Sequence, residues 1–230
     1  MRKLKAIVFD LDDTLFPERQ YALSGFAAVA DWAAVTLGVP SEQGYAELEA
    51  FFEAGVRGDT FNRWLEAHDQ EPDRWVPEMV KCYRDHTPSL KPYPETHSVL
   101  KKLRRSYRLG LITQGHRLGQ QRKIEALELT DYFEAILIMG EEDRKDWKPS
   151  QVPFERLLAE LDLPGSEAAY IGDNPLKDFV GSRRLGMLTV WVRRPEGEHV
   201  NDIPPTPEYS ADHELPDLIA LENALEGGLA

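Results

Sequence analysis

The sequence predicts an α/β protein, with a Rossmann-like parallel sheet as its core and an inserted all-helical domain. Three observations support this fold class. Short apolar segments alternate with helical patterns after about residue 95, whereas residues 17–86 show only helical patterns. A strand-like segment at residues 4–9 precedes that helical block. Alternating helices and apolar strands are typical of parallel sheets with right-handed crossovers, so the helical block is most simply an insertion.

The elements before the insertion boundary follow from apolar periodicity. The segment from Lys3 to Phe9 starts polar and becomes fully apolar, as expected of a buried strand with a solvated start. Ser41 follows the break Gly38-Val39-Pro40 and is expected to cap the second helix of the block. The helices expected in the block cover residues 18–37, 41–54, 60–68 and 73–86.

A proline-rich connector, TPSLKPYP at residues 87–94, marks the strongest boundary in the chain. After it, helices are expected over residues 95–105, 117–128, 151–161 and 175–184, and strands over residues 107–112, 135–139, 168–171 and 188–192. The proline-rich segment 195–208 reads as a loop. We therefore assign residues 1–16 and 91–230 to the α/β core and residues 17–90 to the helical domain.

Composition restricts the classes of function. The net charge of −13 argues against a broad surface for nucleic-acid backbones. No apolar run approaches the roughly 20 residues that span a bilayer, and Asp10 ends the first apolar run too early for a signal peptide. Cys82 is the only cysteine, which excludes an intrachain disulfide and a thiolate metal cluster. We expect a cytoplasmic protein without nucleic-acid or membrane partners; monomer and dimer remain open.

Polar residues follow four of the expected strands. In an open parallel sheet, ligands bind beyond the carboxyl ends of the strands, so these residues should meet at one edge. Crowded carboxylates disfavour one another's ionisation, and a hard cation among them together with a lysine would offset their charge. The segments are DLDDT (residues 10–14), TQG (113–115), KP (148–149) and GDNPLKD (172–178).

In this order, the four segments resemble the motifs of the haloacid dehalogenase-like hydrolases. The helical insertion between the first two segments resembles the small α-helical cap of one subfamily. Two departures from the family pattern concern substrate geometry: Gln114 stands where asparagine is common, and Asp146-Trp147 precedes the lysine where a small residue is common.

The resemblance implies a role for each motif residue. Asp10 would be the nucleophile that forms an aspartyl-phosphate, and Asp12 would protonate the leaving alcohol and then activate water. The Asp10 carboxylate, the Asp12 carbonyl and Asp173 would hold Mg²⁺, whereas Asp178 would orient this site rather than bind the ion.

The remaining implied roles concern the phosphoryl group and the leaving group. Thr113 and the amides of Gln114 and Gly115 would bind the phosphoryl group, and Lys148 would balance its charge. Arg63, on a glycine-flanked segment of the insertion, is a candidate contact to the rest of the substrate. The competing interpretation is that Arg63 is merely solvated.

The resemblance therefore implies a Mg²⁺-dependent phosphatase of a small phosphomonoester, a sugar phosphate or a nucleotide-like compound. A phosphomutase would use the same core residues and remains an alternative. A dehalogenase is disfavoured because it needs neither a metal nor an acid at position 12. A non-enzymatic phospho-receiver module combines similar residues on a parallel sheet, but it would be shorter and would lack a cap.

Overall fold

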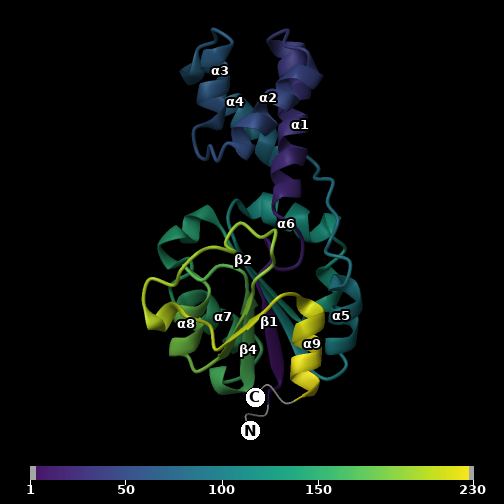
Figure 1. Cartoon of the computed structure of the whole chain (residues 1–230), viewed down its shortest axis with the longest axis vertical. Coiled ribbons are helices and arrows are strands. Elements are labelled where there is room, and N and C mark those ends of the chain that lie inside the picture. Colours follow the sequence, from purple (N-terminus) through teal and green to yellow (C-terminus); the bar gives the residue numbers. More distant parts are fainter. Residues whose placement is uncertain (1–3, 228–230) are drawn as a thin grey trace. The chain divides into compact units, whose positions relative to one another are not determined.

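The computed structural model describes residues 4–227, so Lys3 of the expected first strand lies outside the described residues. The chain divides into two compact units. The described residues up to Glu18 and from Lys91 onward form the α/β unit, and Arg19–Leu90 form a helical unit. Figure 1 gives the order of the elements along the chain. Each unit is described on its own below.

The α/β unit is built on one parallel sheet, which confirms the predicted fold class. Its strand order is β3-β2-β1-β4-β5-β6, and each neighbouring pair is parallel. The first strand of the chain therefore lies in the middle of the sheet, between β2 and β4. The strands are β1 (Ala6–Phe9), β2 (Arg108–Gln114), β3 (Ala135–Met139), β4 (Ala168–Gly172), β5 (Leu188–Val192) and β6 (His213–Leu215).

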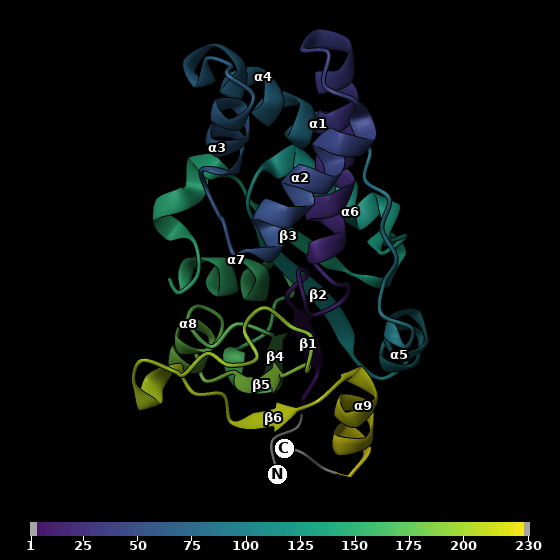
Figure 2. The ribbon, with the colours of Figure 1, turned by 45° about the horizontal axis from the view of Figure 1, so that its top comes forward.

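Helices cover both faces of this sheet, which is why its central strands can be apolar on both sides. All four residues of β1 are fully buried. Figure 2 shows α7 and α8 on one side of the sheet and α5 and α9 on the other. On the first side, Phe154, Leu157 and Phe179 pack against apolar strand residues. The helices of this unit are α5 (Thr96–Leu103), α6 (Arg117–Ala126), α7 (Val152–Glu160), α8 (Phe179–Arg184) and α9 (Leu218–Glu226).

Some elements differ from the sequence-based expectations. Strand β2 runs to Gln114, two residues further than expected, because Thr113 and Gln114 pair with Ile138 and Met139 of β3. The helix expected over 175–184 begins only at Phe179, because the preceding residues form a turn in which Asp178 N donates to the Asn174 carbonyl. Strand β6 and helix α9 were not expected at all.

The helical unit contains four helices around its own apolar core. Trp64 is fully buried there, and its indole Nε1 donates to Glu47 Oε2 at 2.9 Å, so it is a packing residue. The expected cap at Ser41 is wrong: Ser41 is the first residue of its helix, and its hydroxyl donates to Asp31 Oδ1. The helices are α1 (Arg19–Thr36), α2 (Ser41–Glu53), α3 (Thr60–Ala67) and α4 (Pro72–Asp85).

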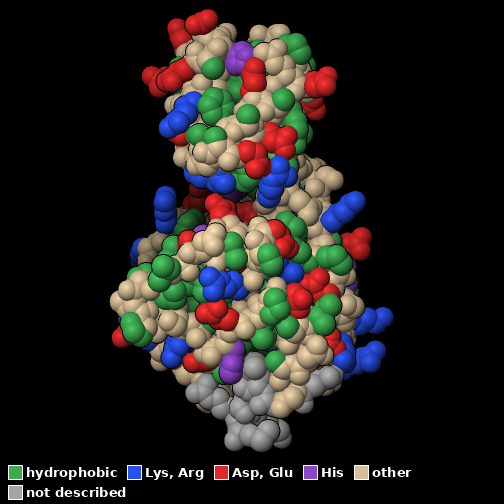
Figure 3. All heavy atoms as spheres, in the orientation of Figure 1, with side chains coloured by type: hydrophobic (Ala, Val, Ile, Leu, Met, Phe, Trp, Pro, Cys, Tyr) green, Lys and Arg blue, Asp and Glu red, His purple; other side chains and the backbone are tan. Residues whose placement is uncertain are grey.

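The surface is mixed in charge. Acidic and basic side chains are interspersed over the face shown in Figure 3. Among residues 4–227, no helix has both the length and the apolar character needed to cross a bilayer.

Two glycines provide a test of the packing. A Cβ on Gly181 of α8 would lie 2.6 Å from the Ser150 carbonyl oxygen and 2.8 Å from that of Pro149. Gly181→Ala should therefore lower the free energy of unfolding by about 1–3 kcal/mol, because backbone atoms must move. A Cβ on Gly44 of α2 would meet its nearest neighbours at 3.5 Å, an ordinary contact. Gly44→Ala should therefore raise that free energy by about 0.5–1 kcal/mol. Urea denaturation of both variants measures the difference, and equal effects would contradict the packing described.

Candidate active site

Three strands deliver polar side chains to the same edge of the sheet. Asp10, Thr113 and Asp173 lie at the carboxyl ends of β1, β2 and β4, and β1 is hydrogen-bonded to both of the other strands. The backbone N–H of Asp10 donates to the Ile171 carbonyl at 2.8 Å, which fixes Asp10 beside the end of β4. Asp10 is therefore central on this edge.

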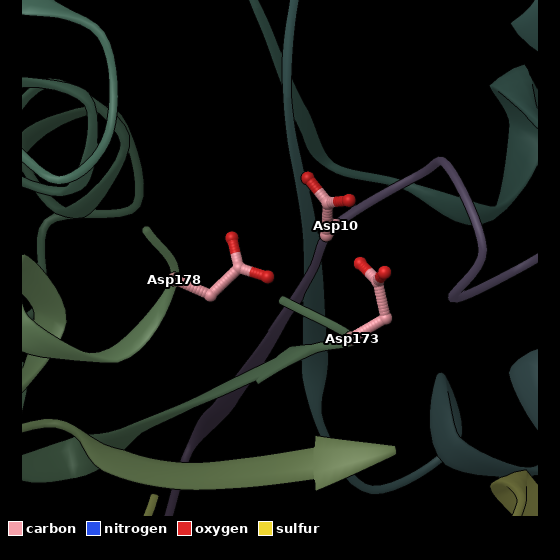
Figure 4. A group of neighbouring side chains, drawn as sticks. All are labelled: Asp10, Asp173 and Asp178. Atoms are coloured by element: carbon pink, nitrogen blue, oxygen red, sulfur yellow. The ribbon is translucent and has the colours of Figure 1, made fainter. Parts of the chain in front are cut away.

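Three buried carboxylates converge at this point, as Figure 4 shows. One oxygen from each of Asp10, Asp173 and Asp178 lies within 4.8 Å of the others. A glycine permits the approach of Asp178, because a Cβ on Gly172 would lie 2.4 Å from Asp178 Oδ2. The sheet edge thus concentrates negative charge in a volume that excludes most water.

The proximity of these acids perturbs their protonation. Burial raises the pKa of Asp10 to about 6, with Asp178 adding to the rise and Lys148 opposing it. Burial, followed by the charges of Asp178 and Asp10, raises the pKa of Asp173 well above its usual range. Burial, together with repulsion among the carboxylates, therefore outweighs the compensation by the protein's own cations, and an added cation would favour the ionised forms of Asp10 and Asp173.

Lys148 supplies the main compensating charge. Its ammonium is fully buried and donates to Asp10 Oδ1, to the Tyr170 hydroxyl at 2.8 Å and to Asp178 Oδ1 at 2.7 Å. Burial lowers the pKa of Lys148, but the charges of Asp10 and Asp178 raise it by more than burial lowers it. The net shift of the pKa is therefore upward, and the ammonium stays charged. Gln114 holds the lysine in place, because its Oε1 accepts from the Lys148 backbone N–H at 2.9 Å.

The donor set suits a hard divalent cation that binds oxygen. The two oxygens of Asp178 are already occupied, one by Lys148 and the other by the Asn174 backbone N–H at 2.9 Å. Contact with Lys148 and Lys177 outweighs burial and holds the pKa of Asp178 below its usual value. Asp10 and Asp173 are therefore the better candidate ligands, and Asp178 is better suited to orient Lys148.

The side chain of Asp12 is held by helix α6. Lys123 Nζ donates to its Oδ1 at 2.6 Å, and Gln120 Nε2 donates to its Oδ2 at 2.9 Å. Burial raises the pKa of Asp12, but the contacts with Lys123 and Gln120 outweigh burial, so its pKa lies below the usual value. The Asp12 carbonyl accepts from the Thr14 N–H at 2.7 Å and keeps a second lone pair for another partner.

The three residues of the TQG segment, Thr113 to Gly115, make different contacts at the edge of the sheet. Thr113 is buried, and its hydroxyl oxygen accepts from Gln120 Nε2. The amide of Gly115 donates to the Met139 carbonyl at 3.1 Å, so within the described residues it is already paired. The side chain of Gln114 supports Lys148 instead of facing the acids.

Arg63 lies in the helical unit, on α3. Its Nε donates to Asp59 Oδ2 at 2.7 Å, and just over half of its side chain (54%) is exposed. The neighbouring Phe61 packs edge-on against Phe26 and Tyr83, so it contributes to the core of that unit.

Three residues of the site were missed at the sequence level: Gln120, Lys123 and Tyr170. Gln120 and Lys123 are three residues apart on the helix that follows Thr113, a spacing that places both on one helix face. A lysine on the sheet-facing side of that helix was the signal that could have found them. Tyr170 lies inside a fully buried strand, and its sequence gives no sign of its contact with Lys148.

Comparison with known proteins identifies relatives that cover most of the chain. A model of the family described as haloacid dehalogenase-like hydrolase matches residues 7–192. A glyceraldehyde 3-phosphate phosphatase of Pyrococcus abyssi is 34% identical over 83% of this chain and 82% of its own. A pyrimidine 5'-nucleotidase of Escherichia coli is 26% identical over 93% of this chain and 96% of its own. The crystal structure of a HAD phosphatase from Thermococcus onnurineus matches with a TM-score of 0.62 and 26% identity, covering 97% of this chain and 99% of the other.

The raised pKa of Asp173 gives a test in the absence of metal. Its unfolded form ionises near 3.8, whereas the folded form keeps its proton to higher pH, so folding loses stability as pH rises through that window. Asp173→Asn removes this penalty. With EDTA present, its thermal midpoint should exceed that of the wild type by about 2–4 °C at pH 8 and by less at pH 5. The control, Asp131→Asn at an exposed position, should show no such trend, and a lower midpoint for Asp173→Asn at pH 8 would contradict the described repulsion.

Proposed function

The chain belongs to the family of haloacid dehalogenase-like hydrolases, and we propose that it is a Mg²⁺-dependent phosphatase of a small phosphomonoester. The observation that carries the proposal is the environment of Asp10, which lies at the centre of the sheet edge between Lys148 and Asp173. The names of the relatives support a sugar phosphate or a nucleotide as substrate. Membership of a hydrolase family argues against a non-enzymatic phospho-receiver module.

In the first half of the reaction, Asp10 is the nucleophile. Lys148 binds Asp10 Oδ1, which leaves Oδ2 to attack phosphorus. The aspartyl P–O bond forms while the bond to the leaving-group oxygen breaks, and that oxygen takes a proton from Asp12. Lys148 stays charged throughout and offsets the negative charge that builds up around the phosphoryl group.

In the second half, water attacks the phosphorus of the aspartyl-phosphate. Asp12 accepts a proton from this water, and the aspartyl P–O bond breaks to regenerate Asp10. The contacts of Lys123 and Gln120 with Asp12 favour its ionised form, which is the form that Asp12 takes once it has given its proton to the leaving group and the form needed as a base.

The metal would be held by the Asp10 carboxylate, by Asp173 and by the carbonyl of Asp12. Once bound, Mg²⁺ would supply positive charge to the acids and to the phosphoryl oxygens. Asp178 orients Lys148 and the Asn174 turn and does not bind the ion.

Thr113 is the side chain proposed to bind the phosphoryl group. Its oxygen accepts from Gln120, so its own proton is available for donation to a phosphoryl oxygen. Gln114 acts through Lys148, and Gly115 provides the turn after β2 with a φ of 146°.

We further propose that the helical unit is the cap that selects the leaving group, with the division near residues 17–90. Arg63 is the candidate on this unit for contact with the part of the substrate beyond the phosphate. Its half-exposed guanidinium can exchange Asp59 for an anionic or hydroxylated substrate at little cost, because exposed ion pairs are weak.

Replacement of the nucleophile tests the reaction type. Asp10→Asn should abolish turnover of phosphomonoesters, since an amide cannot attack phosphorus, while vanadate or phosphate should still bind. Asp13→Asn makes the same change three residues away, where the residue has a φ of 51° that asparagine tolerates, and should keep most of the turnover. Phosphate release and calorimetric binding distinguish the two variants. Substantial activity in Asp10→Asn would refute the mechanism, and recovery of a transferred phosphoester instead of free phosphate would favour the phosphomutase alternative.

Metal dependence tests the cofactor. EDTA should stop turnover, and Mg²⁺ should restore it. Asp173→Asn should need roughly 10–100 times more Mg²⁺ for half-maximal rate, because one of its ligands has lost its charge. Titration of activity with Mg²⁺ measures this shift. An unchanged Mg²⁺ requirement in Asp173→Asn would show that Asp173 is not a ligand.

A further inference from the structure

Two residues of α6 grip the carboxylate of Asp12 at separate oxygens. Lys123 Nζ lies 2.6 Å from Oδ1, and Gln120 Nε2 lies 2.9 Å from Oδ2. Both side chains are almost fully buried, with 3% and 4% of their residue surface exposed. A carboxylate held at both oxygens by independent donors cannot rotate about its Cβ–Cγ bond without losing one of them.

The two donors are themselves fixed. Gln120 also donates to the Thr113 hydroxyl oxygen, so it connects the end of β2 to Asp12. Helix α6 starts directly after this strand, where His116 Nδ1 accepts from the Gly119 N–H at 3.3 Å. The orientation of Asp12 is therefore set by α6 and β2 and not only by the loop that carries it.

A purely packing role does not explain a charged side chain at position 123. Burial of an ammonium is energetically unfavourable, and an apolar side chain of similar length would avoid that cost. The structure compensates the charge with Asp12 at 2.6 Å and with Glu18 at 3.7 Å. Asp12 is the nearer of these two acids, and it is the one to which the proposed function gives proton transfer.

We propose that Lys123 and Gln120 are positioning residues that aim the Asp12 carboxyl group at the leaving-group oxygen. This inference rests on the proposed phosphatase function. In the step concerned, the proton passes from Asp12 to the leaving-group oxygen while that oxygen keeps the electron pair of the broken P–O bond. Each carboxyl oxygen has two lone pairs, so it can accept from α6 and still exchange a proton with the substrate.

The leaving group reports this role selectively. p-Nitrophenolate leaves without a proton, whereas an alkoxide such as that of glycerol phosphate does not. Lys123→Met should lower kcat for glycerol phosphate by about 10–100-fold, as expected when a proton donor is misplaced by about 1 Å. The rate constant of the pre-steady-state burst of p-nitrophenol from p-nitrophenyl phosphate should fall less than threefold. KM for both substrates should hardly change.

Four further variants make the result interpretable. Asp12→Asn should show the same selectivity with a larger loss, Lys123→Arg should recover most of the glycerol phosphate rate, and Lys101→Met at an exposed position of α5 should match the wild type. Gln120→Met should show the same selectivity and replaces Lys123→Met as the test if that variant does not fold.

The outcomes separate this inference from the proposed function. Equal losses of rate on both substrates, or no loss, in Lys123→Met and Gln120→Met would overturn the positioning role. The wild type and Asp12→Asn would in that case still support the phosphatase. Failure of the wild-type protein to release phosphate from either substrate would overturn the proposed function and this inference with it.

Discussion

The ammonium of Lys148 is buried among the carboxylates of Asp10 and Asp178, and the arrangement of the sheet edge depends on it. A buried charge is tolerated only when it is paired, and three converging carboxylates are tolerated only when something positive lies among them. Tyr170 of β4 and Gln114 of β2 fix the lysine by contacts from either side of β1. Lys148 and the Asn174 N–H together occupy both oxygens of Asp178, which leaves Asp10 and Asp173 as the acids that can face a substrate or a cation.

The strand pattern and the strand ends were predictable because both are local properties of the sequence. Buried parallel strands are short apolar runs, and their carboxyl ends share an edge whatever the order of the strands. This is why the sequence alone groups Asp10, Lys148, Asp173 and Asp178, and these residues do lie together in the structure. Polar motif residues followed several expected strands in turn, and this recurrence made the prediction of the site specific.

The elements and contacts that were missed depend on tertiary structure. Strand β6 has only three residues, and all of them are at least partly exposed. It therefore lacks the apolar run that would have predicted its pairing with β5. The contacts of Lys123 and Gln120 with Asp12 join residues more than 100 positions apart. From the sequence alone, a buried lysine is expected to be a surface residue, because the distant partner that compensates its buried charge is not apparent.

The position of β1 has a consequence for how the chain acquires its site during synthesis. β1 is made first, but its partners are β2 and β4, whose residues Arg108 and Ala168 pair with Ala6. The helical unit lies between β1 and β2 in the chain and consists of one continuous segment. Its contacts are mainly local, and local contacts form fastest. The central strand therefore lacks one of its two partners until β4 has left the ribosome. Only then can Asp10 meet Asp173, so a nascent chain that stops short of β4 lacks part of the candidate site.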